Sequence, residues 1–125
     1  MDKTVVLSVD DEPTVSKLIE TICENAGFDV HCVNSGKEAL ERLKDIEPTV
    51  VLMDLNMPDM DGIETVKQIR SQFPDLVAPM IFLTASRNWN EVGKISDVDG
   101  TYLMKPVTPR RLVDKINDVI GGGSG

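Results

Sequence analysis

The sequence lacks a long hydrophobic run. No segment can span a bilayer, and acidic residues interrupt the first apolar stretch, within MDKTVVLSVDDEP, before it reaches the length of a signal-peptide core. Basic charge is also scarce, because 13 Lys and Arg face 21 Asp and Glu, for a formal net charge of -8. Negative charge disfavours binding to nucleic acid and anionic lipid and suits a divalent cation. We therefore expect a soluble, cytoplasmic protein with no direct nucleic-acid or membrane partner.

Cysteine and histidine are scarce as well. Cys23 and Cys32 have no metal-ligand spacing, and we expect both to be reduced, buried side chains. His31 is the only histidine, and we place it in an edge strand with no chemical role. The 125 residues suit one domain, which we predict at 1–120, followed by a flexible linker or tail, GGGSG, at 121–125.

Short β-branched runs alternate with helical patterns along the chain. The expected strands are 4–9, 28–33, 49–54, 79–84 and 101–104. Helices should begin at Pro13 with the acid before it as a cap, after Ser35 as an N-cap, near Gly62, and at Pro109 with Thr108 as a cap. A weakly patterned helix is expected within 86–100. These repeated units predict an α/β fold with an open, doubly wound parallel sheet, in which a ligand site lies beyond the carboxyl ends of the strands.

Four of these carboxyl ends carry reactive side chains. Three acids follow the first strand, and an acid, a hydroxyl and an amine stand at the ends of the third, fourth and fifth: Asp10-Asp11-Glu12, Asp54, Thr84 and Lys105. Clustered carboxylates repel one another unless a hard cation such as Mg²⁺ lies among them. An ammonium and a hydroxyl can share the charge of a phosphoryl group, and an aspartate can be the nucleophile. The pattern therefore predicts phosphoryl transfer.

The acidic stretch MDLNMPDMDG, residues 53–62, raises the alternative of a calcium loop. If Gly62 were the sixth loop position, the first would be Met57 and the twelfth Gln68, where an Asp and a bidentate Glu are required. The stretch is therefore not a calcium loop. We assign Asp59 and Asp61 to turn and capping roles before the third helix.

Four motifs together resemble the signatures of response-regulator receiver domains. They are Asp10-Asp11, Met53-Asp54 with the following Met57-Pro58-Asp59-Met60-Asp61-Gly62, Thr84-Ala85, and Lys105-Pro106. They stand in the family's order, each at a strand end, and the similarity extends from about Thr4 to Ile120. The resemblance implies a flavodoxin-like fold, with strand order 2-1-3-4-5 and five helices.

The resemblance implies Asp54 as the phosphoacceptor and a bound Mg²⁺. Asp11 would bind the ion directly and Asp10 through water, alongside Asp54 and the backbone carbonyl of Asn56. The phosphate oxygens would be held by Lys105, the Thr84 hydroxyl and the Ala85 backbone N–H. Tyr102 would be the switch residue, its ring turning inward as Thr84 moves toward the phosphate.

The resemblance further implies a two-component or phosphorelay function. A sensor histidine kinase or phosphotransfer protein would supply the phosphoryl group, and the output would be a downstream protein or a fused effector domain. Such a domain is not an enzyme beyond catalysing its own phosphorylation and dephosphorylation. A docking module that acts without phosphorylation stays open as the alternative. An aspartyl phosphatase is disfavoured, because Asn56 stands where a second Asp is needed. The segment 87–99 departs most from the family, on the face where the family usually transmits its signal.

Overall fold

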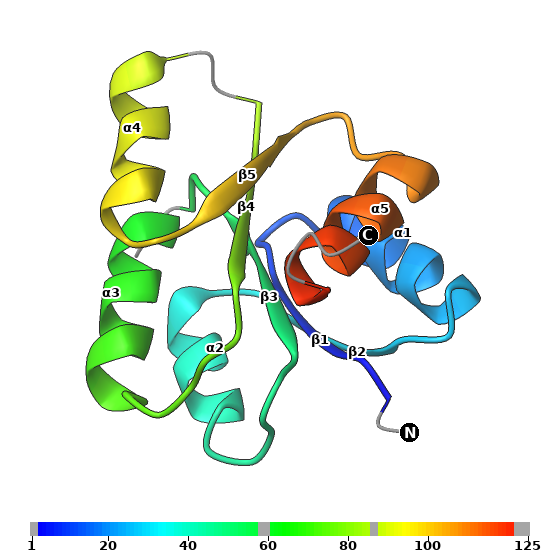
Figure 1. Ribbon diagram of the computed structural model, residues 1–125, viewed down its shortest axis with the longest axis horizontal. Helices are drawn as coiled ribbons and strands as arrows, with labels where there is room; N and C mark the ends of the chain where they lie inside the picture. Colours follow the sequence, from blue (N-terminus) through cyan, green and yellow to red (C-terminus); the bar gives the residue numbers. More distant parts are fainter. Residues whose placement is uncertain (1–2, 58–60, 86–87, 122–125) are drawn as a thin grey trace.

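The computed structural model describes residues 3–57, 61–85 and 88–121, in which strands and helices alternate along the chain (Figure 1). In order they are β1 (Val5–Val9), α1 (Pro13–Asn25), β2 (Asp29–Val33), α2 (Gly36–Arg42), β3 (Val50–Asp54), α3 (Gly62–Gln72), β4 (Met80–Thr84), α4 (Trp89–Asp97), β5 (Thr101–Met104) and α5 (Pro109–Ile120). Asp59 and 122–125 lie outside the described residues, so the turn role and the tail stay predictions.

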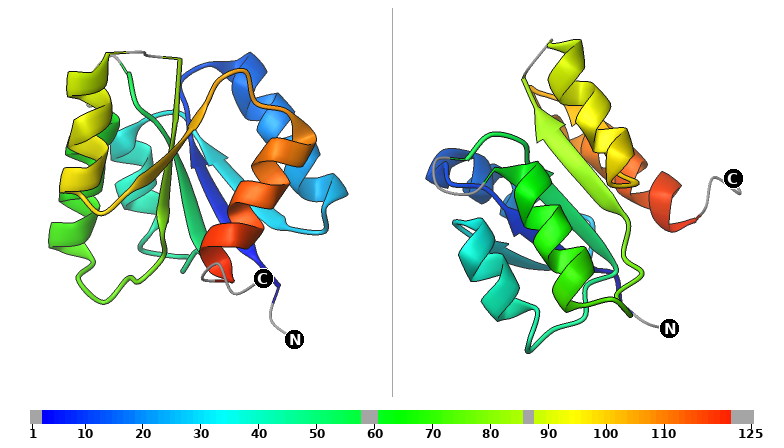
Figure 2. Two further views of the ribbon diagram at one scale, coloured as in Figure 1. Left: turned by 45° about the horizontal axis from the view of Figure 1, so that its top comes forward. Right: turned by 90° about the vertical axis from the view of Figure 1, so that its left-hand side faces the viewer.

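The five strands form one parallel sheet in the order β2-β1-β3-β4-β5. In β1, the strand next to the edge strand β2, Leu7 lies between His31 of β2 and Val51 of β3. Helices α1 and α5 cover one face of the sheet, and α2, α3 and α4 cover the other (Figure 2). The predicted flavodoxin-like, doubly wound fold is therefore confirmed.

The core consists of two layers separated by the sheet. Alternate strand residues point to opposite faces, so neighbours such as Val6 and Leu7 belong to different layers. The layer under α2, α3 and α4 contains Leu7, Val51, Met53 and Phe82. The layer under α1 and α5 contains Val6, Leu52, Ile81 and Leu83. The central strands are buried on both faces, as their continuous apolar sequences require.

The helix N-termini confirm two predicted caps and correct two others. The Ser35 side chain accepts a hydrogen bond from the Glu38 N–H, and the Asp61 side chain caps α3 in the same way. Glu12 and Thr108 occupy the N-cap positions of α1 and α5, but neither side chain makes a capping hydrogen bond. A proline follows each of them and needs no acceptor for its nitrogen, so the need for a side-chain cap is smaller.

The weakly patterned segment forms a helix, as predicted. Within α4, Ile95 is buried, and Val98 follows as the buried C-cap residue. Across the described ranges, no helix combines the length and apolar composition that crossing a membrane requires.

Candidate functional site

The predicted reactive residues meet at one edge of the sheet. Asp54 is the last residue of β3 and Thr84 the last of β4, while Asp10 and Lys105 directly follow β1 and β5. Because β1, β3, β4 and β5 are neighbours in a parallel sheet, their carboxyl ends lie at the same edge. The fold therefore brings together side chains that are far apart in the sequence. Asp54 and Lys105, for example, are 51 positions apart.

The ammonium of Lys105 lies among three carboxylates. Its Nζ is 3.5 Å from Asp54 Oδ1, 3.6 Å from Glu12 Oε1 and 3.8 Å from Asp10 Oδ2. The Lys105 side chain is only 19% exposed. Three carboxylates and one ammonium leave two negative charges, which a divalent cation would neutralise.

The carboxylate oxygens are close enough to surround a small cation. One oxygen each of Asp10, Glu12 and Asp54 lie within 4.8 Å of one another. Oxygens on opposite sides of an octahedral Mg²⁺ are about 4.2 Å apart, so small movements would suffice. Asp10 is 1% exposed, and its Oδ2 accepts no hydrogen bond from the described residues. A buried oxygen in this state suits a cation, so this acidic site is compatible with Mg²⁺.

Burial and mutual repulsion shift the proton affinities of these groups. Burial, followed by the charge of Asp10, raises the pKa of Asp54 to about 6, although Lys105 and the Asn56 backbone N–H oppose the shift. Burial also raises the pKa of Asp10. In Lys105 burial lowers the pKa, but Asp54, Asp10 and Glu12 outweigh it, and the net shift is upward. At neutral pH the Asp54 carboxylate is ionised and can act as a nucleophile.

The raised pKa of Asp54 predicts a pH-dependent stability in cation-free protein. Its pKa is about 6 in the folded protein against an ordinary value of 3.8. Between these values the unfolded chain has released a proton that the folded protein retains, so the free energy of unfolding falls as the pH rises. At pH 7 we expect the free energy of unfolding of Asp54→Asn to exceed that of the wild type by about 2 kcal/mol, allowing for solvent screening. Near pH 4 the two values should differ little. Urea unfolding in EDTA measures both differences, and equal differences would contradict the prediction.

The remaining predicted metal ligands are less closely grouped. Asp11 is exposed and is not one of the three converging carboxylates. The Asn56 backbone N–H donates to the Asp54 carboxylate, which fixes the loop after β3 against the site. The ligand roles of Asp11 and the Asn56 carbonyl stay predictions.

The predicted phosphate-binding and switch residues surround the same edge. Thr84 is 1% exposed, and its carbonyl accepts a hydrogen bond from the Lys105 N–H at 2.8 Å. Ala85, the next residue, is exposed. Tyr102 lies beside Phe82 in the β4–β5 register and is 37% exposed. The peptide bond between Lys105 and Pro106 is cis.

Glu12 is the site residue whose role sequence reasoning missed. It is the third acid after β1, and the pattern favoured helix capping because Pro13 follows it. Its side chain instead pairs with Lys105, while its N–H donates to Asp10 Oδ1 at 2.9 Å. The run of three acids was the available signal, but a contact between residues 12 and 105 depends on the fold.

A buried glycine fixes the other side of the site. Gly62, the first residue of α3, donates its N–H to the Leu55 carbonyl at 2.9 Å. A Cβ at this position would meet the Asp54 carbonyl oxygen, and it would lie 3.1 Å from both Leu55 Cα and Met53 Cγ. The start of α3 therefore packs directly against the backbone that carries Asp54.

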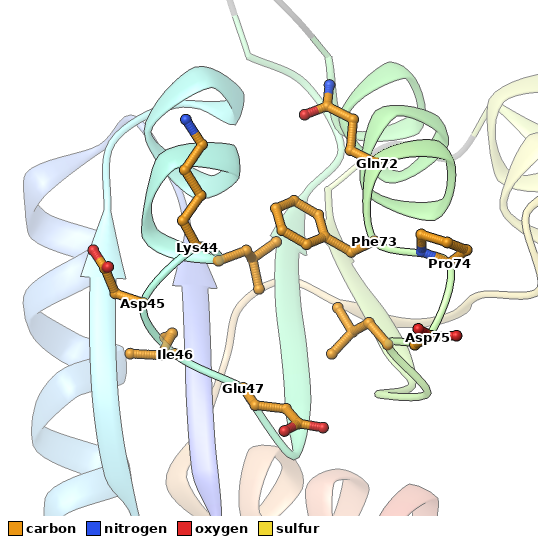
Figure 3. Close-up of a pocket in the computed structure, with 10 residues that line it drawn as sticks. Lys44, Asp45, Ile46, Glu47, Gln72, Phe73, Pro74 and Asp75 are labelled. Atoms are coloured by element: carbon orange, nitrogen blue, oxygen red, sulfur yellow. The ribbon is translucent and has the colours of Figure 1, made fainter.

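A large hollow lies away from these residues. It has a volume of about 520 Å³ and lies between the C-terminal ends of α2 and α3, where Ile46 and Phe73 are among the apolar residues that line it (Figure 3). None of the converging carboxylates lines it. The converging carboxylates therefore lie at the carboxyl edge of the sheet, apart from this hollow.

The sequence matches the family described as the response regulator receiver domain over residues 6–117. The chain therefore belongs to this family. The DNA-binding response regulator MtrA of Mycolicibacterium smegmatis is 33% identical over 113 residues, which are 89% of this chain and 48% of MtrA. The regulatory protein AtoC of Escherichia coli is 45% identical over 80 residues, 64% of this chain and 17% of AtoC. The chain thus spans half or less of these relatives.

Solved structures agree with the assignment. The chemotaxis protein CheY4 of Vibrio cholerae superposes with a TM-score of 0.89 at 29% identity, covering 94% of this chain and 99% of CheY4. The receiver domain of the sensor histidine kinase PA1611 of Pseudomonas aeruginosa gives a TM-score of 0.85 at 26% identity, with 96% and 99% covered. That structure has a magnesium ion coordinated in its active site cleft.

Proposed function

We propose that Asp54 accepts a phosphoryl group from the phosphohistidine of a sensor histidine kinase or phosphotransfer protein. The observation that carries the proposal is the ionisable Asp54 carboxylate, nearly buried at a strand end and 3.5 Å from the Lys105 ammonium. A carboxylate oxygen attacks phosphorus as the phosphorus–nitrogen bond breaks, and the bonding electron pair stays on the imidazole nitrogen. The product is an aspartyl phosphate.

The neighbouring residues hold the charge that the transfer creates. Lys105, the Thr84 hydroxyl and the Ala85 N–H bind the phosphoryl oxygens. Asp10, Asp11, Asp54 and the Asn56 carbonyl would hold Mg²⁺, which would shield the negative charge of the phosphoryl group. The two negative charges that remain in the carboxylate–lysine group support a divalent rather than a monovalent ion.

The phosphoryl group then acts as a conformational signal. Thr84 moves toward the phosphate and the Tyr102 ring, exposed in this structure, turns inward. The output is a downstream protein or an effector domain fused to the same chain, as the greater length of the relatives suggests. The domain itself contacts no nucleic acid, acts in the cytoplasm, and catalyses only its own phosphorylation and dephosphorylation.

Incubation with acetyl phosphate and Mg²⁺ tests this proposal. We expect the intact mass of the protein to increase by one phosphoryl group, and the product to be stable in acid and labile in base. Replacing Mg²⁺ with EDTA should reduce the labelling rate by at least about tenfold, since loss of charge stabilisation at a transferring phosphoryl group costs on the order of 10²–10³ in rate. If neither acetyl phosphate nor a panel of phosphorylated histidine kinases labels the protein, the module acts by docking alone.

A further inference from the structure

We propose that Glu12 is a cation-recruiting residue, which pairs with Lys105 in the cation-free protein and would turn to the divalent cation when the ion enters. The inference rests on the proposed function, because it concerns the same acidic site. Glu12 is not among the expected metal ligands. It would contribute a negative charge and a side chain that can move.

The main chain of Glu12 is fixed while its side chain is free to move. Its N–H donates to Asp10 Oδ1 at 2.9 Å, and its carbonyl accepts from the Ser16 N–H at 3.0 Å in the first turn of α1. The side chain caps no helix and is 61% exposed, against 6% for Asp54 and 1% for Asp10. Of the three converging carboxylates, only Glu12 can therefore reorient without disturbing the core.

The charge count gives Glu12 its effect on the cation. Asp10, Glu12 and Asp54 carry three negative charges against the one positive charge of Lys105. Without Glu12 the group would carry one net negative charge, and its attraction for a divalent ion would be weaker. The Oδ2 of Asp10 lies on the buried side of the same group, is 1% exposed and accepts no hydrogen bond from the described residues, although the Lys105 ammonium is 3.8 Å away.

Lys105 and the cation compete for these carboxylates. The ammonium lies 3.6 Å from Glu12 and 3.8 Å from Asp10. An entering cation repels the ammonium and attracts Glu12, so Lys105 loses the exposed partner and keeps Asp54, the group to be phosphorylated. Because Glu12 is exposed to water, its ion pair with Lys105 is weak. Breaking this pair therefore costs little free energy.

Titration with Mn²⁺, in the absence of any phosphodonor, tests the role of Glu12. The free ion is followed by EPR, and Mg²⁺ competition then gives the affinity for Mg²⁺. We expect Glu12→Gln to bind both ions roughly 3- to 10-fold more weakly, as for one unit charge about 5 Å from a divalent ion in screened solvent. Glu12→Asp keeps the charge and should lose less. Glu24→Gln removes an equal charge from an exposed site near the far end of α1, the helix that Glu12 precedes, and should bind like the wild type.

The possible outcomes distinguish a failure of the role of Glu12 from a failure of the proposed function. Equal affinities for Glu12→Gln and Glu24→Gln, or tighter binding by Glu12→Gln, would overturn the role of Glu12 and leave the phosphoacceptor site standing. Failure of the wild type to bind either ion would overturn the cation site as a whole. Thermal unfolding in EDTA, expected to be nearly equal for all variants, excludes a loss of affinity through misfolding.

Discussion

Asp54→Asn will abolish phosphorylation by acetyl phosphate. The substitution keeps the size and shape of the side chain, but an amide oxygen is a far poorer nucleophile than a carboxylate and cannot form the acyl phosphate. The variant should remain folded, because the buried, crowded carboxylate has a pKa raised to about 6 and its charge is unfavourable in the folded state. Intact mass spectrometry after incubation with Mg²⁺ and acetyl phosphate should show no added phosphoryl group.

Asp61→Asn is the matched control for this experiment. Asp61 also lies in the acidic stretch after β3, but its side chain accepts a hydrogen bond from the Glu64 N–H at 2.8 Å and caps α3. Asparagine caps helices about as well as aspartate, so this variant should fold and be labelled like the wild type. Labelling of Asp54→Asn at the wild-type rate would falsify the assignment of the phosphoacceptor.

Gly62→Ala will strongly destabilise the protein and displace Asp54. The added methyl group would meet the Asp54 carbonyl oxygen and lie 3.1 Å from Leu55 Cα, and backbone atoms cannot rotate away as a side chain could. Overpacking of this kind costs on the order of 3 kcal/mol. Urea unfolding followed by circular dichroism should show the loss, and slower labelling by acetyl phosphate should accompany it, because α3 must move away from the strand that carries Asp54.

A second glycine provides the control for Gly62→Ala. Gly93 lies within α4, and a Cβ at this position would meet nothing within 4 Å. Alanine favours the helix over glycine, so Gly93→Ala should stabilise the protein by about 0.5–1 kcal/mol. If Gly62→Ala lowers the free energy of unfolding by no more than Gly93→Ala raises it, the start of α3 can adjust to the extra methyl group.

The sequence was informative wherever a local pattern determines the structure. The apolar runs of β1, β3 and β4 predicted buried strands, and all three are buried. Ser35 was recognisable as a helix cap because capping depends on residues only three positions apart. The strand order came from the resemblance to a family, since periodicity predicts strands but not their neighbours.

Features that depend on distant residues could not be predicted in this way. Glu12 followed the local rule for a cap, but the Lys105 ammonium, brought to it by β5, is its partner instead. The exclusion of Asp11 from the converging carboxylates has the same origin, because the backbone at the end of β1 decides which of three successive acids faces Asp54. One sequence contains the side chains of such a site but not their directions.

The shallow attachment of α4 has a consequence for how the domain can diversify. Ile95 is the buried residue among the α4 side chains described, whereas α3 buries Ile63, Val66 and Ile69. Counted over the α4 side chains that the structure describes, local opening exposes less apolar surface than opening of α3 would, so its free energy should lie below that of global unfolding. Substitutions on this helix therefore cost little stability and leave the carboxylate edge intact.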